Sequence, residues 1–371
     1  MAPIRILVVD DSVVIRKLLS DTLSGDPAFE VVGVASDGRI ALSKIPLLKP
    51  DLITLDIEMP VMDGLQTLAE VRKLYPKLPV IMFSTLTERG AAATLDALSL
   101  GASDYTTKPS NTGSPEVAIE RIRSELIPKI KALCGVGPLK LLPLAGTRPA
   151  VKARVRTSPP RIEVVAIGTS TGGPNALTAV LPQIPGDFPV PIVVVQHMPP
   201  IFTRLLAERL ASRSAISVEE GRAGVLLVAG HAWIAPGNFH MRVVHGGVHC
   251  SLSTNQAAPE NSCRPAVDVL FRSVAVAYGA NVLGVVMTGM GADGARGAQA
   301  IRDAGGEVFV QDEASSVVWG MPGMVYASGL ADAVYPLERM AAEITQRVLQ
   351  SRIPRPKFEL KSYASLERPA K

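Results

Sequence analysis

The sequence has few cysteines, and their number and spacing exclude two classes of protein. Cys134, Cys250 and Cys263 are the only three in 371 residues, and they are far apart in the chain. A disulfide-stabilised secreted domain has a dense, usually even set of cysteines, and a structural zinc site has closely spaced pairs. The sequence therefore predicts a cytoplasmic protein whose fold depends on neither disulfides nor zinc.

Long uncharged runs and an excess of one charge are also nearly absent. Residues 274–292 carry no charge, but four glycines and Asn281 interrupt them, which indicates soluble core and not a membrane span. No signal peptide precedes the first apolar stretch. The formal charge is only +4, and no basic stripe is interleaved with aromatic residues. We therefore expect neither membrane insertion nor a nucleic-acid partner.

Short apolar stretches alternate with amphipathic ones over the first 134 residues. Strands are predicted at residues 4–9, 30–34, 51–55, 80–83 and 103–106, and helices at 13–24, 39–47, 65–75, 89–99 and 115–133. Alternating strands and helices form a parallel sheet with helices on both faces. Because right-handed crossovers bring the carboxyl end of every strand to one edge, ligands bind there.

Polar side chains follow these strands at the shared edge. In strand order they are Asp10 and Asp11, Asp56, Ser84 and Lys108. Three carboxylates this close repel one another unless a hard divalent cation lies among them, and an oxygen-rich site suits Mg²⁺. A lysine and a hydroxyl nearby would bind a phosphoryl group on one carboxylate. A single aspartate could be a helix cap, but the whole set predicts a phosphoacceptor site.

These residues stand in motifs that resemble response-regulator receiver domains: VVDDS, LDIEMPVMDG and TKP. The resemblance implies a flavodoxin-like receiver over residues 1–134, with a five-stranded parallel sheet and Asp56 as the phosphoacceptor. The Mg²⁺ ligands would be Asp10, Asp11, Asp56 and the backbone carbonyl of Glu58. The residues that respond to the phosphoryl group would be Ser84, Tyr105 and Lys108. A histidine kinase would be the phosphodonor.

The periodic pattern breaks at residues 135–160 and then resumes. This stretch has five prolines and little periodicity, which predicts a flexible linker. Strands then recur at residues 162–168, 191–196 and 281–287, each before a helical pattern. They predict a doubly wound α/β domain over residues 161–351, with a β-hairpin insertion in the glycine-rich stretch 225–253. Residues 352–371 are polar and predict a loose tail.

The first strand of the second region leads into GTSTG, residues 168–172. This matches G-x-S-x-G, the strand-to-helix turn that presents a serine hydroxyl at a sheet edge. A helix-capping serine or an anion-binding turn would read the same way. A nucleophilic Ser170 needs a base, and His197 ends the next apolar strand at the same predicted edge. The other four histidines fit surface or hairpin positions, although His240 is harder to dismiss.

Two interpretations compete for the segment after strand 281–287. Asp293 falls at the same edge and could orient His197 and stabilise its charge, as the acid of a catalytic triad does. However, GMGADG at residues 289–294 also fits the dinucleotide motif G-x-G-x-x-G, with Asp312 near the ribose-binding position. The carboxylate of Asp293 would oppose an anionic pyrophosphate. The triad also uses Ser170 and His197, so it is favoured.

The motifs of the second region together resemble the CheB family of chemotaxis protein-glutamate methylesterases. They are IGTSTGGP, QHMPPIFT, IAPGNFHM, RPAVDVLF, MTGMGADG and DEASSVVWGMP. The resemblance implies a serine esterase whose triad is Ser170, His197 and Asp293. The oxyanion would be held by the backbone N–H groups of Met290 and Thr171. Thr169 departs from the alanine that is common in this motif. No cofactor is expected in the esterase site.

By the same resemblance, the substrate is a glutamyl methyl ester on a methyl-accepting chemoreceptor. Some relatives also deamidate receptor glutamines, so a glutaminase activity stays open. The kinase would be of the CheA type, and the unphosphorylated receiver would cover the sheet edge that bears Ser170. The alternative is a response regulator whose second domain only binds other proteins.

Overall fold

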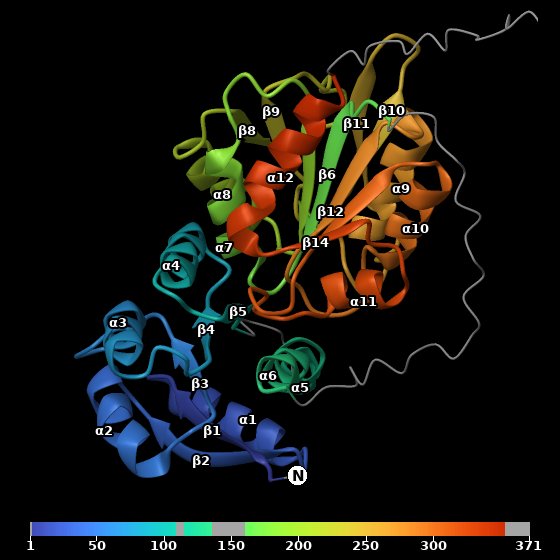
Figure 1. The fold of residues 1–371 in the computed structure, drawn as a ribbon. Coiled ribbons are helices and arrows are strands. Elements are labelled where there is room, and N and C mark those ends of the chain that lie inside the picture. Colours follow the sequence, from blue (N-terminus) through green and yellow to red (C-terminus); the bar gives the residue numbers. More distant parts are fainter. Residues whose placement is uncertain (1, 109–114, 136–159, 353–371) are drawn as a thin grey trace, which may run out of the picture.

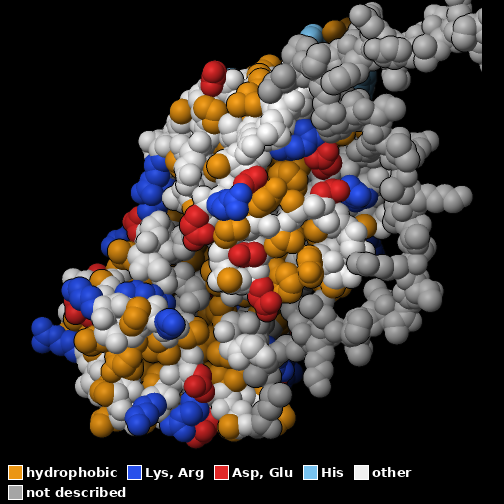
Figure 2. All heavy atoms as spheres, viewed as in Figure 1, with side chains coloured by type: hydrophobic (Ala, Val, Ile, Leu, Met, Phe, Trp, Pro, Cys, Tyr) orange, Lys and Arg blue, Asp and Glu red, His pale blue; other side chains and the backbone are white. Residues whose placement is uncertain are grey.

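The computed structural model describes residues 2–108, 115–135 and 160–352, which form two α/β units (Figure 1). The linker predicted at 135–160 and the tail predicted at 352–371 lie almost wholly outside the described residues. No helix in the described ranges is both long and apolar enough to cross a membrane. On the face shown in Figure 2, outside the grey atoms, Lys and Arg side chains are interspersed with Asp and Glu and form no basic stripe.

The first unit is a five-stranded parallel sheet in the order β2-β1-β3-β4-β5. The strands are β1 (Ile4–Val9), β2 (Phe29–Ala35), β3 (Leu52–Asp56), β4 (Val80–Ser84) and β5 (Asp104–Thr107). Their side chains are almost all buried in β1, β3, β4 and β5 because helices cover both faces. The predicted strands are confirmed to within a residue or two.

The helices of this unit begin beside the polar residues at the strand ends. They are α1 (Val13–Ser24), α2 (Gly38–Leu48), α3 (Gly64–Leu74) and α4 (Glu88–Ser99). Ser12, for example, accepts a hydrogen bond from the Ile15 N–H and caps α1. The helix predicted at 115–133 contains a π-helical stretch, Ile122–Leu126, between α5 (Pro115–Arg121) and α6 (Ile127–Leu133).

The second unit is a seven-stranded parallel sheet in the order β14-β13-β12-β6-β7-β9-β8. Its central strands are β6 (Val164–Thr169), β7 (Ile192–Gln196) and β12 (Val282–Val286), and the outer ones are β8 (Ser217–Glu220), β9 (His231–Ile234), β13 (Glu307–Gln311) and β14 (Ala333–Tyr335). The helices are α7 (Gly173–Val180), α8 (Phe202–Ala211), α9 (Val267–Tyr278), α10 (Ala295–Asp303), α11 (Met321–Ala327) and α12 (Leu337–Gln350), with a 3₁₀ turn at Leu181–Gln183. The doubly wound α/β prediction is confirmed.

The predicted hairpin insertion is confirmed only in its second half. β10 (His240–His245) and β11 (Cys250–Asn255) form an antiparallel hairpin, as expected. The segment before it contributes β9 to the main sheet, in parallel with β7 and β8. The reason is burial: Ala232, Trp233 and Ile234 are buried on both faces, which an exposed hairpin would not allow.

The two units meet through α4 and β5 of the first and α7 and α8 of the second (Figure 1). The Asn175 side-chain amide donates to the Leu98 carbonyl at 2.8 Å, and Arg209 pairs with Asp96 at 2.7 Å. Tyr105 stacks on Phe202 with ring centroids 4.8 Å apart and planes 8° from parallel. This contact lies at the carboxyl end of β6 and β7, where Ser170 and His197 are placed.

Candidate phosphoacceptor and hydrolase sites

The charged residues predicted at the first sheet edge lie together. Lys108 Nζ is 2.7 Å from Asp56 Oδ2 and 3.0 Å from Asp10 Oδ2, and both carboxylates are buried. Burial raises the pKa of Asp56 to about 6, although the hydrogen bond and the charge of Lys108 oppose the rise. Carboxylate oxygens of Asp10, Asp11 and Asp56 lie within 4.8 Å of one another. This all-oxygen set suits a hard cation such as Mg²⁺.

The predicted switch residues are not all directed at Asp56. The Ser84 hydroxyl donates to the carbonyl of Gly90 at 3.0 Å, on α4. Tyr105 is buried and faces Phe202 of the second unit. The backbone N–H of Glu58 donates to Asp56 Oδ1 at 3.3 Å. Among the described residues, therefore, only Lys108 of the three predicted switch residues has a hydrogen bond or ion pair with Asp56.

Ser170 stands in a tight turn between β6 and α7. Its N–H donates to the Thr288 carbonyl at 3.0 Å, and its own carbonyl accepts from the Gly173 N–H at 2.8 Å. Gly172 has a φ of 78°, which a residue with a side chain rarely adopts. A Cβ on Gly289 would lie 2.9 Å from Ser170 Cβ, so a glycine is needed on that side as well. The two glycines allow the turn to close against β12.

His197 and Asp293, which are 96 residues apart, form a direct hydrogen bond. His197 Nε2 lies 2.8 Å from Asp293 Oδ2. Burial disfavours the charged imidazole, but the bond to Asp293 and the contact with Cys263 outweigh it and raise the pKa of His197 to about 10. Burial would raise the pKa of Asp293, yet His197 and two backbone N–H groups lower it. The carboxylate of Asp293 therefore stabilises the imidazolium that forms when His197 takes up a proton.

The first turn of α9 fixes the carboxylate of Asp293. Its Oδ2 accepts the Val267 N–H at 2.7 Å, and its Oδ1 accepts the Asp268 N–H at 3.0 Å. Asp268 in turn accepts the N–H groups of Gly294 and Gly297 at the start of α10, at 2.9 and 2.7 Å. Asp293 thus accepts hydrogen bonds from the free N–H groups at the start of α9, and Asp268, in α9, accepts them from the start of α10.

This reciprocal arrangement contradicts the dinucleotide interpretation of GMGADG. A pyrophosphate would need the N–H groups at the start of α10, and the Asp268 carboxylate already binds two of them. Asp312, the proposed ribose-binding acid, instead accepts hydrogen bonds from the N–H and the hydroxyl of Ser315. The glycines here serve the turn around Asp293.

Sequence reasoning missed three polar residues that support this site. The Gln196 amide donates to the Ser170 carbonyl at 3.0 Å and to the His197 carbonyl at 3.2 Å, so it joins the two strand ends. Asn261 donates to Asp293 Oδ1 at 2.9 Å, and Cys263 Sγ lies 3.5 Å from His197 Nδ1. Gln196 directly precedes His197 and could have been suspected; Asn261 and Cys263 lie in a turn that carries no motif.

The predicted oxyanion donors are placed beside the serine turn. The Thr171 carbonyl accepts from the Thr288 hydroxyl at 2.9 Å, and its side chain donates to Asp104 of the first unit at 2.7 Å. The backbone N–H groups of Thr171 and Met290 have no acceptor within the described ranges. Over the same ranges no hydrogen bond joins Ser170 Oγ to His197, whose Nδ1 faces Cys263.

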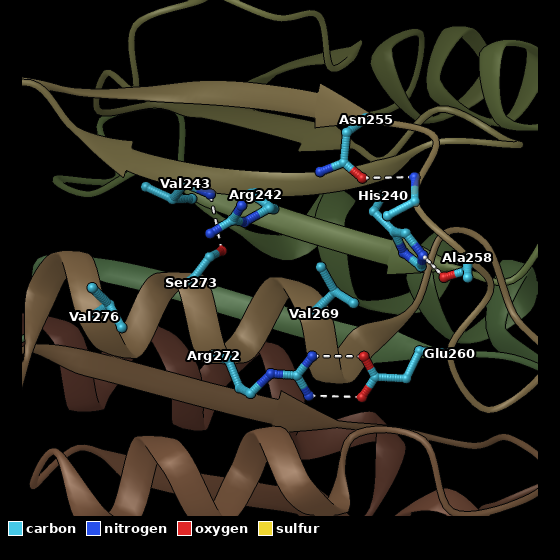
Figure 3. A pocket seen from close by; sticks show the side chains of 11 residues that line it. His240, Arg242, Val243, Asn255, Ala258, Glu260, Val269, Arg272, Ser273 and Val276 are labelled. Carbon is cyan, nitrogen blue, oxygen red and sulfur yellow. Dashed lines mark hydrogen bonds and ion pairs between the residues drawn. The ribbon is translucent and has the colours of Figure 1, made fainter.

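The remaining histidines lie away from this cluster. His240 lines a separate cavity of about 370 Å³ between α9 and the β10–β11 hairpin (Figure 3). Its Nε2 lies 3.0 Å from the Ala258 carbonyl, and Arg272 and Glu260 form an ion pair across the same cavity. His231 stacks on Trp233. We therefore keep His197 as the candidate base.

The fold and the two sites define a response regulator in which a receiver contacts an α/β hydrolase. The receiver-domain model of response regulators matches residues 6–120, and the CheB methylesterase model matches residues 165–344. The chain belongs to the CheB methylesterase family.

Relatives match over nearly the whole chain. A protein-glutamate methylesterase/protein-glutamine glutaminase of Trichodesmium erythraeum is 55% identical over 94% of this chain and 100% of its own length. One from a Nocardioides species is 50% identical over 95% of this chain and 97% of its own. The crystal structure of the Thermotoga maritima CheB methylesterase catalytic domain is 40% identical, with a TM-score of 0.50, over 50% of this chain and 99% of that one.

Proposed function

We propose that this chain is a phosphorylation-activated serine esterase that hydrolyses glutamyl methyl esters on chemoreceptors in the cytoplasm. The observation that carries the proposal is the 2.8 Å bond between His197 and Asp293 at the sheet edge that bears Ser170. Relatives that are 50–55% identical over nearly the whole chain have the name of this activity. A domain that only binds proteins would have no use for a histidine–aspartate pair at the strand ends that also carry a tight serine turn.

Each nitrogen of His197 has a role in this proposal. Because Nε2 is bound to Asp293, Nδ1 is the nitrogen that takes the proton from Ser170. Ser170 Oγ then attacks the ester carbonyl, and the N–H groups of Met290 and Thr171 receive the oxyanion; one such donor lowers the barrier by ~3 kcal/mol. His197 returns the proton to the leaving methanol, and water hydrolyses the acyl-enzyme by the same route.

The receiver regulates this site by covering it. Asp104 of β5 accepts a hydrogen bond from Thr171, the residue after Ser170, and pairs with Lys129 at 3.2 Å. Tyr105 stacks on Phe202 at the start of α8. Phosphorylation of Asp56 would draw Lys108 and Ser84 to the phosphoryl group and weaken this contact. A change of a few kcal/mol is enough to convert a mostly closed population to a mostly open one.

The phosphoryl group would come from a histidine kinase of the CheA type. Mg²⁺ would be held by Asp10, Asp11, Asp56 and the backbone carbonyl of Glu58, and it would supply positive charge for the phosphoryl oxygens. The buried carboxylates fit this ion because, among the described residues, only Lys108 forms an ion pair with Asp10 and Asp56. Lys108 would remain to bind the phosphoryl group once Mg²⁺ neutralises Asp10.

The direct test measures methanol released from a methyl-labelled receptor. Wild-type protein should release methanol, and acetyl phosphate with Mg²⁺ should increase the rate. Ser170→Ala should abolish release but still accept phosphate at Asp56, and Asp56→Asn should keep the basal rate without the increase. Equal release by wild type and Ser170→Ala would exclude the esterase. A 160–352 fragment no more active than the unphosphorylated chain would exclude the covering model.

The relatives' names also include a glutaminase activity. The same residues can hydrolyse a glutamine amide, since His197 can protonate the leaving ammonia as it protonates methanol. Ammonia release from an unmethylated receptor that carries glutamines would measure this. Loss of both methanol and ammonia release in Ser170→Ala would assign both activities to one site.

A further inference from the structure

Cys263 lies against the nitrogen of His197 that the serine needs. Its Sγ is 3.5 Å from Nδ1, while Nε2 is 2.8 Å from Asp293. A thiol, an imidazole and a carboxylate therefore stand in series, and their candidate ligand atoms lie within 4.8 Å of one another. An activated nucleophile requires a base within reach and a third group that orients the base. In this structure the cysteine meets both conditions, and Ser170 has no hydrogen bond to the base within the described residues.

The turn that carries Cys263 is built against the hydrolase site. Asn261 and Ser262 have φ values of 52° and 62°, in the left-handed region that side chains disfavour. Two hydrogen bonds stabilise this turn: the Asn261 side-chain amide donates to Asp268 at 3.0 Å and to Asp293 at 2.9 Å. Paired backbone bonds between Glu260 and Cys263, of 3.1 and 2.9 Å, close the turn. Strain that is this well supported is typical of functional positions.

The three cysteines of the chain have different surroundings. An imidazole within reach of a thiol can act as its base, and among the described residues only Cys263 has an imidazole nitrogen as a neighbour, at 3.5 Å. Cys250 is buried in the hairpin. Burial raises the pKa of Cys134 to about 11, with a further contribution from Asp51. Cys134 and Cys250 therefore serve as internal controls when the reactivity of Cys263 is measured.

We propose that Cys263 is a second nucleophile of the hydrolase site, with His197 as its base and Asp293 orienting that base, and that its oxidation by a small hydroperoxide inactivates the esterase. His197 takes the thiol proton as the sulfur attacks one peroxide oxygen, and the O–O bond breaks. The sulfur is oxidised to a sulfenic acid, and the leaving hydroxide or alkoxide is reduced and takes the proton of the imidazolium. The modified sulfur then occupies the space beside Nδ1. The inhibitory half of this inference rests on the proposed esterase function; the reactivity half does not.

The reactivity is measured on the whole chain by limited alkylation with iodoacetamide at pH 7, followed by peptide mass spectrometry. Because His197 can take the thiol proton as the sulfur attacks the reagent, Cys263 should react about 10-fold faster than Cys134 and Cys250. His197→Gln should remove that advantage and leave the rates at Cys134 and Cys250 unchanged, which also shows that the variant is folded. Equal rates at all three cysteines, or an unchanged Cys263 rate in His197→Gln, would overturn the proposal.

The switch is measured by methanol release after treatment with hydrogen peroxide, each protein relative to its own untreated rate. Wild type should lose most of its activity and regain it with dithiothreitol, whereas Cys263→Ala and Cys263→Ser should keep theirs. Cys134→Ser should be inhibited like wild type. Equal inhibition of Cys263→Ala would refute the switch. If untreated wild type released no methanol, the proposed function would fail, while the alkylation result would still decide the reactivity.

Discussion

The two sheets of this chain both place buried aspartates at the carboxyl ends of their strands, but they treat the charge in opposite ways. In the part of the chain that the structure describes, Asp56 pairs with one cation, Lys108, which it shares with Asp10, and burial raises the pKa of Asp56 to about 6. Asp293 has His197, Asn261 and the first N–H groups of α9, and its pKa is lowered despite burial. The surroundings therefore disfavour the ionised carboxylate of Asp56 and stabilise that of Asp293.

This difference corresponds to two kinds of chemistry. A phosphoacceptor changes its bonding in each cycle, and a carboxylate with few fixed hydrogen bonds can accept a phosphoryl group and a metal ion without breaking many contacts. The acid of a triad must keep one position and one charge, so several fixed donors suit it. Variants that change one charged or hydrogen-bonding group at a time test this comparison.

The largest effect is expected from Asp293→Asn. The amide cannot stabilise the imidazolium and favours the wrong tautomer of His197, so kcat should fall about 10³- to 10⁴-fold. Phosphorylation at Asp56 should be unaffected, because the receiver site does not contact Asp293. The measurement is methanol release alongside incorporation of labelled phosphate. Asp303→Asn, at the exposed end of α10, is the matched control, and a similar loss there would contradict the assignment.

Asn261→Ala removes one of the fixed donors to Asp293 and leaves the three proposed triad residues themselves unchanged. A hydrogen bond to a charged group contributes ~1.5 kcal/mol, so kcat should fall about 10-fold. KM should change little, and Asn261→Asp should not restore the rate, since it places another anion beside Asp293. Steady-state kinetics of the three proteins decides the matter. An unchanged kcat would mean that the α9 N–H groups alone hold the carboxylate.

Asp104→Ala should release the receiver from the serine turn. It removes the acceptor of Thr171 and the partner of Lys129, so the unphosphorylated rate should rise about fivefold, which corresponds to ~1 kcal/mol. The phosphorylated rate should stay the same. Asp26→Ala breaks a comparable receiver ion pair, with Lys131, and should raise nothing. A rise in both variants would indicate general destabilisation.

Asp56→Asn should stabilise the fold near neutral pH, with no effect on basal esterase activity. The folded pKa of about 6 exceeds the ordinary 3.8, so Asp56 favours the folded state fully below about pH 4 and loses that contribution as pH rises through 6. At pH 7 the variant should exceed wild type by on the order of 1 kcal/mol in the free energy of unfolding. Urea titrations at pH 7 and pH 4 should show the gap closing; an equal gap at both would contradict the cause.

The sequence could predict those site residues whose position follows from sheet topology alone. Asp56, Ser170, His197 and Asp293 lie at or just after strand ends, and parallel topology alone brings such positions to one edge. The helices and strands of the first unit were predicted closely for the same reason. Strand β9 was not assigned to the parallel sheet, because its short apolar run reads equally well as half of a hairpin.

The supporting residues could not be found this way. Asn261 and Cys263 belong to a turn whose path depends on left-handed backbone at two residues with side chains, and no local pattern predicts that. The contact between Asp104 and Thr171 joins the two units across 67 residues. Its existence depends on how the units dock, which neither sheet determines alone.

The stack of Tyr105 on Phe202 has a consequence for the input side of the chain. Coupling between two equilibria is mutual: if phosphorylation loosens the stack, the stack must resist phosphorylation by the same factor. The hydrolase domain then disfavours phosphorylation of the receiver. A receiver separated from it would bind a phosphoryl mimic such as beryllofluoride more tightly than the intact chain does.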